Sequence, residues 1–265
     1  MEFDPIVDRD PWADEVDGRI DWDITPDPSI RRATREAYSA ICPETGVEAV
    51  LKLDHPEARI VDAGLREKIC CDLAQELGVP TPGALLYKSE AKQGVAVRRL
   101  HGGVSFIMWK QTFKNLYPRI GFISIARNKY PLSMVVLDWY VGNSDRNNLG
   151  NILVLGDTGD PAFVPIDFGN TLGTTEMPWS DPLYRWDYCH GYGRPHPAWL
   201  ELDEPTRDTI YGFCDKLSQI PDDLIRRIVY RATTYYTVNL ATSPADIEKR
   251  LIERKEKARE WISKN

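Results

Sequence analysis

The stretch that decides the fold runs from Met134 to Leu172 and reads MVVLDWYVGNSDRNNLGNILVLGDTGDPAFVPIDFGNTL. It begins with apolar residues at helical spacing, continues through a polar loop at 142–150, and then contains two short apolar runs, at 152–155 and 163–166. Glycine, aspartate and proline separate the two runs, as is typical of a turn. The stretch therefore predicts a helix, a polar loop and a hairpin that ends in Asp167-Phe-Gly.

This layout suits phosphoryl transfer, which needs a carboxylate beside the attacking hydroxyl and oxygen ligands that hold Mg²⁺ against the nucleotide phosphates. Asp145, in the polar loop, is the candidate for the first role. Asn151 enters the hairpin and Asp167 leaves it, so the two can share one metal because a hairpin brings its ends together. The alternative is an ordinary polar loop. Asp157 and Asp160 are interpreted in that way, as solvated turn residues.

Residues 143–151, followed by Pro-Ile-Asp-Phe-Gly at 165–169, resemble HipA-like kinases and the related phosphatidylinositol 3-/4-kinase group. The resemblance implies an α+β fold of two lobes, with ATP and Mg²⁺ bound between them. In the kinase pattern the metal-binding Asn stands five residues after the catalytic Asp, and here that position is Gly150. Asn151 is assigned as the ligand because it directly precedes the strand, and Asn148 is the alternative.

Two residues of the N-terminal third complete the set that the resemblance implies. Residues 47–53 predict a strand that places Lys52 between two leucines. Residues 62–77 predict a helix with an apolar residue at every fourth position, and Glu67 lies off that stripe. The spacing around Glu67 resembles the HipA-like helix that carries the partner of the strand lysine. This implies a Lys52–Glu67 ion pair that holds the lysine for the phosphates; a surface lysine and a solvated helix carboxylate are the alternatives.

The nucleotide site extends to a predicted hinge after the strand at 94–100, where backbone groups are expected to recognise adenine. The residues expected there are Arg98, Arg99, Leu100 and His101. Gly102-Gly103 allows the lobes to move. No glycine-rich loop is present. The candidates for phosphate contact in its place are Ser29, Thr34, Arg31 and Arg32, and a solvated basic patch is the alternative.

The sequence divides into three parts. Residues 1–28 are an acidic arm with scattered aromatic anchors, interpreted as irregular, residues 29–99 form the small N-lobe, and residues 100–265 form the C-lobe. Residues 170–200 are long, irregular and aromatic, and we expect them to form the activation segment, where substrate is recognised. The C-lobe ends in three predicted helices, at 204–220, 221–240 and 244–263.

Composition restricts the class of partner. The chain has 265 residues, of which 42% are hydrophobic and 28% charged, as in an ordinary globular protein. The net charge of −7 argues against a broad nucleic-acid surface, and no nucleic-acid partner is expected. There is no apolar run of membrane-spanning length and no signal-peptide pattern, so the expected location is the cytoplasm. The five cysteines suggest no disulfide framework, and zinc is not expected.

Three function classes follow from the sequence. The first is a protein serine/threonine kinase, which the HipA-like resemblance favours, with this chain's own Ser29 or Thr34 among its substrates. Such a kinase has a protein substrate, and the resemblance also allows an antitoxin-like or regulatory partner. The second is a kinase for a lipid or small-molecule hydroxyl. The third is a pseudokinase that only binds nucleotide or a partner, and the joint presence of Lys52, Glu67, Asp145 and Asp167 counts against it.

Overall fold

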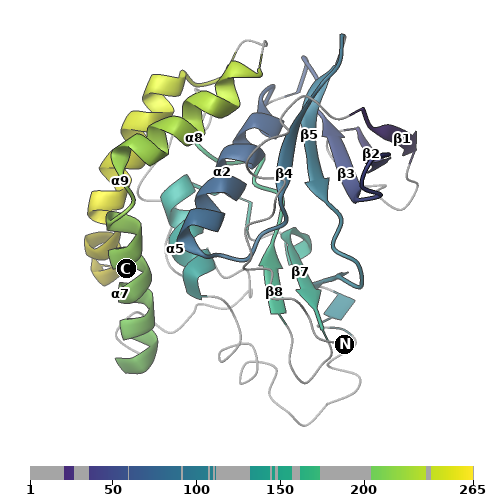
Figure 1. Ribbon diagram of the computed structural model, residues 1–265. Coiled ribbons are helices and arrows are strands. Elements are labelled where there is room, and N and C mark those ends of the chain that lie inside the picture. The colour runs from purple at the N-terminus through teal and green to yellow at the C-terminus, as the bar shows by residue number, and fades with distance from the viewer. Residues whose placement is uncertain are drawn as a thin grey trace.

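The computed structural model describes residues 21–26, 36–58, 60–90, 92–106, 108–109, 111, 132–143, 145–146, 149–156, 162–173, 204–236 and 240–264. Strands dominate the first part of these residues and helices the last part (Figure 1). Several predictions concern residues outside these ranges: the phosphate contacts, the alternative ligand Asn148, most of the acidic arm and most of the activation segment. Within the described residues, no helix has the length and apolar character needed to cross a bilayer.

Five antiparallel strands form the N-terminal sheet, in the order β1-β2-β3-β5-β4. Their bounds are β1 Asp23–Pro26, β2 Ala37–Ile41, β3 Glu48–Leu53, β4 Ala84–Lys88 and β5 Gln93–Arg98. Strand β1 differs from the prediction of an irregular arm over residues 1–28. It pairs with β2, with Asp23 opposite Ile41, and so satisfies backbone groups that would otherwise lie at the sheet edge.

Strand β3 divides its side chains between the two faces of the sheet. Leu51 and Leu53 are buried in a small cluster on one face. Lys52 lies opposite Val95 of β5, and Val95 belongs to the larger core that includes the helix after β3. Because side chains alternate along a strand, Lys52 is directed to the side of the sheet on which that helix packs.

Helix α2, Ala63–Leu77, lies between the sheet and the C-terminal helices and packs against β4, β5 and α8 (Figure 1). The stripe predicted from the sequence is buried: Leu65, Ile69, Leu73 and Leu77. The helix ends at Gly78, whose φ of +69° is a left-handed conformation that glycine adopts without strain. Arg66, Glu67 and Lys68 are also fully buried, so the first part of α2, residues 63–71, is enclosed on all sides, whereas Glu76 near its end is exposed.

The stretch from Met134 to Leu172 contains the helix and the hairpin that the sequence predicts. Helix α5 is Leu132–Val141, and a short 3₁₀ turn, η2, spans Leu149–Asn151. Strands β7, Ile152–Leu155, and β8, Ala162–Pro165, pair as an antiparallel hairpin, with Ile152 opposite Pro165. The two-residue strand β6, Val104–Ser105, adds to the outer side of β7.

Three helices complete the C-lobe, as predicted. They are α7, Glu204–Ser218, α8, Asp222–Thr234, and α9, Pro244–Lys264. Helix α8 ends at Thr234, earlier than the predicted 240, and Tyr236 beyond it donates a hydrogen bond from its hydroxyl to Asp54. This contact joins the segment after α8 to the loop after β3.

Helix α9 stabilises the end of α5 that leads into the polar loop. The Arg254 guanidinium lies over the Trp139 ring, 4.4 Å from its centroid, and donates to the Trp139 carbonyl. Trp261 stacks on the same indole at 4.9 Å between centroids. The neighbouring Lys255 donates to the Ile220 carbonyl at 2.7 Å, at the junction of α7 and α8. A single helix therefore supports both the polar-loop side and the C-terminal side of the lobe.

We predict that Gly94→Ala destabilises the protein at the strand that carries Lys52. A Cβ at position 94 would lie 2.1 Å from the Lys52 carbonyl oxygen, and because this is a backbone atom no side-chain rotation relieves the clash. The expected loss is about 1–3 kcal/mol of unfolding free energy, measured by urea denaturation. Gly212→Ala in α7 is the control, since nothing lies within 4 Å of its added Cβ and helical alanine is favoured over glycine by about 1 kcal/mol. Equal midpoints for the two variants would contradict the prediction.

Candidate active site

Lys52 and Glu67 form an ion pair between β3 and α2, the pair that the sequence leads one to expect. The Lys52 ammonium donates to Glu67 Oε1 at 2.7 Å and to Oε2 at 3.0 Å. The Glu67 side chain is fully buried, whereas that of Lys52 is 15% exposed. A buried carboxylate requires such a partner, because burying an unpaired charge is costly. Glu67 therefore holds the lysine by its ammonium, while part of the Lys52 side chain remains exposed.

Asp167 brings a second carboxylate to the same ammonium from the far end of the hairpin. Its Oδ1 lies 3.3 Å from Lys52 Nζ, and its side chain remains 41% exposed. Asp167 adopts a φ of +60°, which is uncommon outside glycine and costs free energy that the surrounding structure must supply. Lys52, Glu67 and Asp167 thus converge from β3, α2 and the turn after β8.

The polar loop is built around the buried ion pair between Asp138 and Arg146. Arg146 donates from Nε to Asp138 Oδ2 at 2.8 Å, and from a terminal nitrogen to Oδ1 at 3.1 Å. Asn143 adds a third donor to the same carboxylate, at 2.8 Å. Burial raises the pKa of Asp138 above its usual range, and the charge and hydrogen bonds of Arg146 offset part of that rise.

Arg146 also holds both ends of the hairpin. It donates to the carbonyl of Asn151, before β7, and to that of Ile166, after β8, the latter at 3.0 Å. The Ile166 backbone N–H in turn donates to the Asn151 carbonyl at 3.0 Å. One buried guanidinium therefore fixes the loop relative to Asn151 and to the residue immediately before Asp167.

Asp145 lies in the loop so formed and is hydrogen-bonded to three asparagines. Its backbone N–H donates to Asn143 Oδ1 at 3.0 Å. Its Oδ2 accepts from the side-chain amide of Asn151 at 2.9 Å and from that of Asn170 at 3.2 Å. Sequence reasoning missed Asn170, although its place directly after Asp167-Phe-Gly was the available signal. Because the amide nitrogen of Asn151 points to Asp145, its amide oxygen is the atom that can serve as a metal ligand.

Among the described residues, no group of three or more His, Cys, Asp or Glu side chains could hold a metal by itself. The two residues predicted as ligands still suit Mg²⁺, which proteins commonly bind through one or two carboxylates completed by substrate phosphates and water. Asn151 and Asp167 stand at the two hydrogen-bonded ends of the hairpin, and the Asp167 carboxylate is open to solvent.

The residues predicted to recognise adenine lie at the end of β5 and in the segment that leads from it to β6. The backbone N–H of Arg98 donates to the Gly83 carbonyl and that of Arg99 to the Glu48 carbonyl, each at 2.9 Å. These two N–H groups are therefore already hydrogen-bonded within the N-lobe. Recognition of adenine through backbone N–H groups therefore falls to Leu100 and His101, and it stays a prediction.

No protein-family model matches the sequence, and no curated protein matches it. The chain is similar to the crystal structure of a Helicobacter pylori proinflammatory kinase, CtkA, with 16% sequence identity and a TM-score of 0.61, over 91% of this chain and 96% of that one. A Mycobacterium tuberculosis PknI kinase domain matches at 16% identity over 87% of this chain and 92% of that one, but its TM-score of 0.28 is too low to indicate a shared fold. The chain therefore has the α+β fold of a kinase domain, as the sequence predicts, whereas membership of the HipA-like group stays a prediction.

We predict that Arg146→Lys loosens the polar loop. A lysine keeps the charge but lacks the planar fork needed to donate to Asp138 and to both hairpin ends at once. The expected loss is about 2–3 kcal/mol of unfolding free energy, measured by urea denaturation, because buried acceptors lose their donors. Arg226→Lys is the matched control on the exposed side of α8, where Arg226 pairs with Asp223 and Glu248, and its midpoint should stay that of the native chain. A native midpoint for Arg146→Lys as well would show that the fork is dispensable.

Proposed function

We propose that this chain is an ATP- and Mg²⁺-dependent phosphotransferase that moves the γ-phosphate to a hydroxyl, with a protein serine or threonine as the acceptor. The observation that carries the proposal is the convergence of Lys52 with Glu67 and Asp167, beside the linked pair Asp145 and Asn151. These two groups are joined at the hairpin ends by the bond from the Ile166 N–H to the Asn151 carbonyl, and their five residues have the chemical types that phosphoryl transfer requires.

Each side chain has a distinct role in this proposal. Lys52, held by Glu67, places its ammonium against the nucleotide phosphates. Asp145 has one carboxylate oxygen bound by the amides of Asn151 and Asn170, so its other oxygen is left to orient the attacking hydroxyl and accept its proton. The Asn151 amide oxygen and the Asp167 carboxylate hold Mg²⁺. When bound, the metal neutralises charge that develops on the phosphates during transfer.

The acceptor is argued from the sequence. The helix around Glu67 resembles that of HipA-like kinases, and this resemblance implies a protein substrate. The chain also lacks a polybasic cluster that would bring it to anionic lipid. The Pro-Ile-Asp-Phe-Gly string at 165–169 fits the lipid kinases equally well, so a lipid or small-molecule hydroxyl is the alternative acceptor.

The proposal is tested by incubating the purified chain with γ-labelled ATP and Mg²⁺, with and without phosphatidylinositol vesicles, and by locating the label. Phosphoserine or phosphothreonine on this chain or on a co-purifying protein supports protein phosphorylation, and Ser29 and Thr34 are the first positions to inspect. Label found only in lipid or in a soluble metabolite assigns the alternative acceptor. Bound nucleotide with no transfer to any acceptor, and no release of phosphate, would show a pseudokinase.

We predict that Asp167→Asn folds normally but loses turnover. Asparagine is, with aspartate, the non-glycine residue that best tolerates the left-handed backbone at this position, so the φ of +60° can be kept while the charge is removed. Loss of the anionic metal ligand should lower kcat by about 10²-fold or more. The rate of label transfer gives the effect, and the thermal midpoint shows that the fold is intact. Native turnover in this variant would remove Asp167 from the metal site.

The assignment of the second metal ligand predicts a ranking of two variants. Asn151→Ala should abolish most activity, because it removes both the proposed ligand oxygen and the amide that binds Asp145. Asn148→Ala should be mild. Rates are compared over a range of Mg²⁺ concentrations, since a lost ligand raises the Mg²⁺ requirement. The reverse ranking would transfer the ligand to Asn148.

A further inference from the structure

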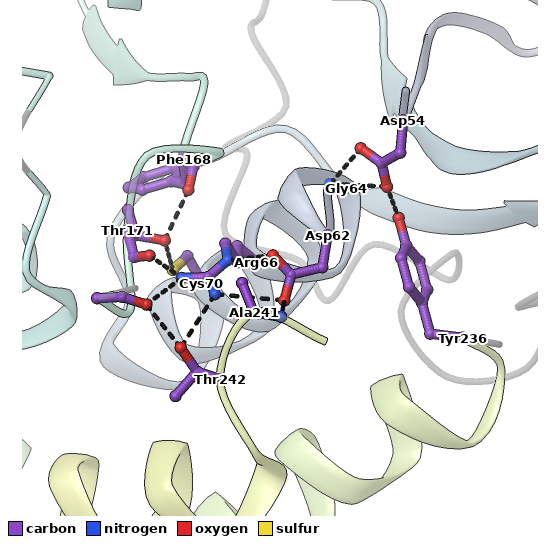
Figure 2. A network of polar contacts seen from close by, with 11 residues as sticks. Asp54, Asp62, Gly64, Arg66, Cys70, Phe168, Thr171, Tyr236, Ala241 and Thr242 are labelled. Atoms are coloured by element: carbon purple, nitrogen blue, oxygen red, sulfur yellow. Dashed lines mark hydrogen bonds and ion pairs between the residues drawn. The ribbon is translucent and has the colours of Figure 1, made fainter. Parts of the chain in front are cut away.

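Helix α2 carries a second buried charge one residue before Glu67, and Figure 2 shows that it contacts three separate parts of the chain. Arg66 donates from Nε to Oδ1 of Asp62, the residue directly before α2, at 2.6 Å. Its terminal nitrogens donate to the carbonyls of Thr171 and Gly173, and to the hydroxyl of Thr242 at 3.3 Å. The Arg66 side chain is fully buried. We refer to Asp62, Arg66, Thr171, Gly173 and Thr242 as the α2 latch.

The α2 latch connects α2 with two segments of the C-lobe that are distant in sequence. Thr171 and Gly173 follow Asp167-Phe-Gly, and Thr242 lies in the linker between α8 and α9. The linker makes two further bonds: the Ala241 backbone N–H donates to Asp62 Oδ2 at 3.0 Å, and the Thr242 hydroxyl donates to the Gly173 carbonyl at 2.8 Å. The three segments are thus hydrogen-bonded pairwise.

Arg66 and Glu67 face different neighbours because successive helical residues are about 100° apart around the axis. Arg66 meets the C-lobe, while Glu67 meets Lys52 on the sheet. A helix moves as a rigid element, so a displacement of Arg66 carries Glu67 with it. We propose that Arg66 is a positioning residue, which acts through the α2 latch to hold helix α2 where Glu67 reaches Lys52. The inference rests on the phosphotransferase function proposed above.

The native chain contains a reporter of this latch. Cys70 lies one turn after Arg66, is fully buried, and has its sulfur 3.2 Å from the Thr171 hydroxyl. Burial raises the pKa of the Cys70 thiol to about 12, and only the thiolate reacts readily with alkylating reagents. Cys214 of α7 is likewise buried, has a pKa raised to about 12, and lies outside the latch. Loosening of α2 should expose Cys70 and its buried neighbour Cys71 but not Cys214, whereas general unfolding should expose all three.

The first experiment measures the rate at which iodoacetamide labels each cysteine in the folded chain, by peptide mass spectrometry. Thr242→Val removes the hydroxyl from the latch, and Arg66→Lys removes the guanidinium fork while keeping the charge beside Asp62. Matched controls are Thr234→Val, whose hydroxyl bonds only within α8 at the Tyr230 carbonyl, and Arg226→Lys on the surface. We expect Cys70 to be labelled about fivefold faster or more in the two latch variants, with Cys214 unchanged, and native rates for both in the controls.

Two results would overturn the inference: a native Cys70 rate in both latch variants, or a parallel rise at Cys214, which would indicate loss of global stability. This experiment requires no catalysis. A chain that transfers no phosphate therefore refutes the proposed function, while the labelling rates still decide whether the latch holds α2.

The second experiment tests that Arg66 acts through Glu67. Arg66→Lys should lower kcat by about tenfold or more with a smaller change in KM for ATP, because misplaced groups affect the transition state most. In a Glu67→Gln background the same substitution should cost little further, since the position of the helix no longer controls the lysine. Equal fold-losses in the two backgrounds would assign Arg66 a general structural role and contradict the inference.

Discussion

The turn at Asp167-Phe-Gly is held on both sides by a buried guanidinium, and the candidate site depends on this constraint. Arg146 binds the carbonyl of Ile166 before the turn and lies 5.0 Å from the centroid of the Phe168 ring, whereas Arg66 binds the carbonyls of Thr171 and Gly173 after it. Each arginine has its own buried carboxylate, Asp138 or Asp62. These pairs lower the cost of burying the two cations, and removing one partner from such a pair typically costs about 3–5 kcal/mol. The turn can therefore keep Asp167 in a strained left-handed conformation with its carboxylate directed at Lys52.

This arrangement makes α2 the element that joins the lobes. Its apolar side chains belong to one continuous core with α5, the hairpin and the C-terminal helices. Its C-terminal carbonyl at Leu77 accepts from Lys216 of α7, and its first turn is tied through Asp54 to Tyr236. Gly64 permits that last contact, because a Cβ there would lie 2.6 Å from the Tyr236 hydroxyl. The C-terminal helices thus contact both α2 and α5, although none of the five residues proposed for phosphoryl transfer comes from them.

Features that depend on local sequence were predictable. The hairpin, α2 with its apolar stripe and glycine stop, and the three C-terminal helices follow from periodicity and turn chemistry. The Lys52–Glu67 pair followed from the strand and helix patterns together with the HipA-like resemblance. The misses have a different origin. Strand β1 pairs with the edge that β2 offers, and just beyond the end of α8 Tyr236 bonds to Asp54, which is 182 positions away in sequence. Asn170 and the two buried arginines also bond to groups in other elements, and no local pattern specifies those partners.

The sequence alone determined which chemical groups are available and on which elements they stand, because helix and strand periods depend on neighbouring residues. It placed Lys52 on a strand, Glu67 on a helix, and Asn151 and Asp167 at the ends of a hairpin. Tertiary structure decided which of these groups meet. Lys52 and Asp167 are 115 positions apart, and Arg66 reaches Thr171 across 105. Contacts at such separations form only when the folded chain has closed the long loops between the two residues. In the packed interior a charge is stable only beside a partner, and the tertiary structure decides which partner lies beside it.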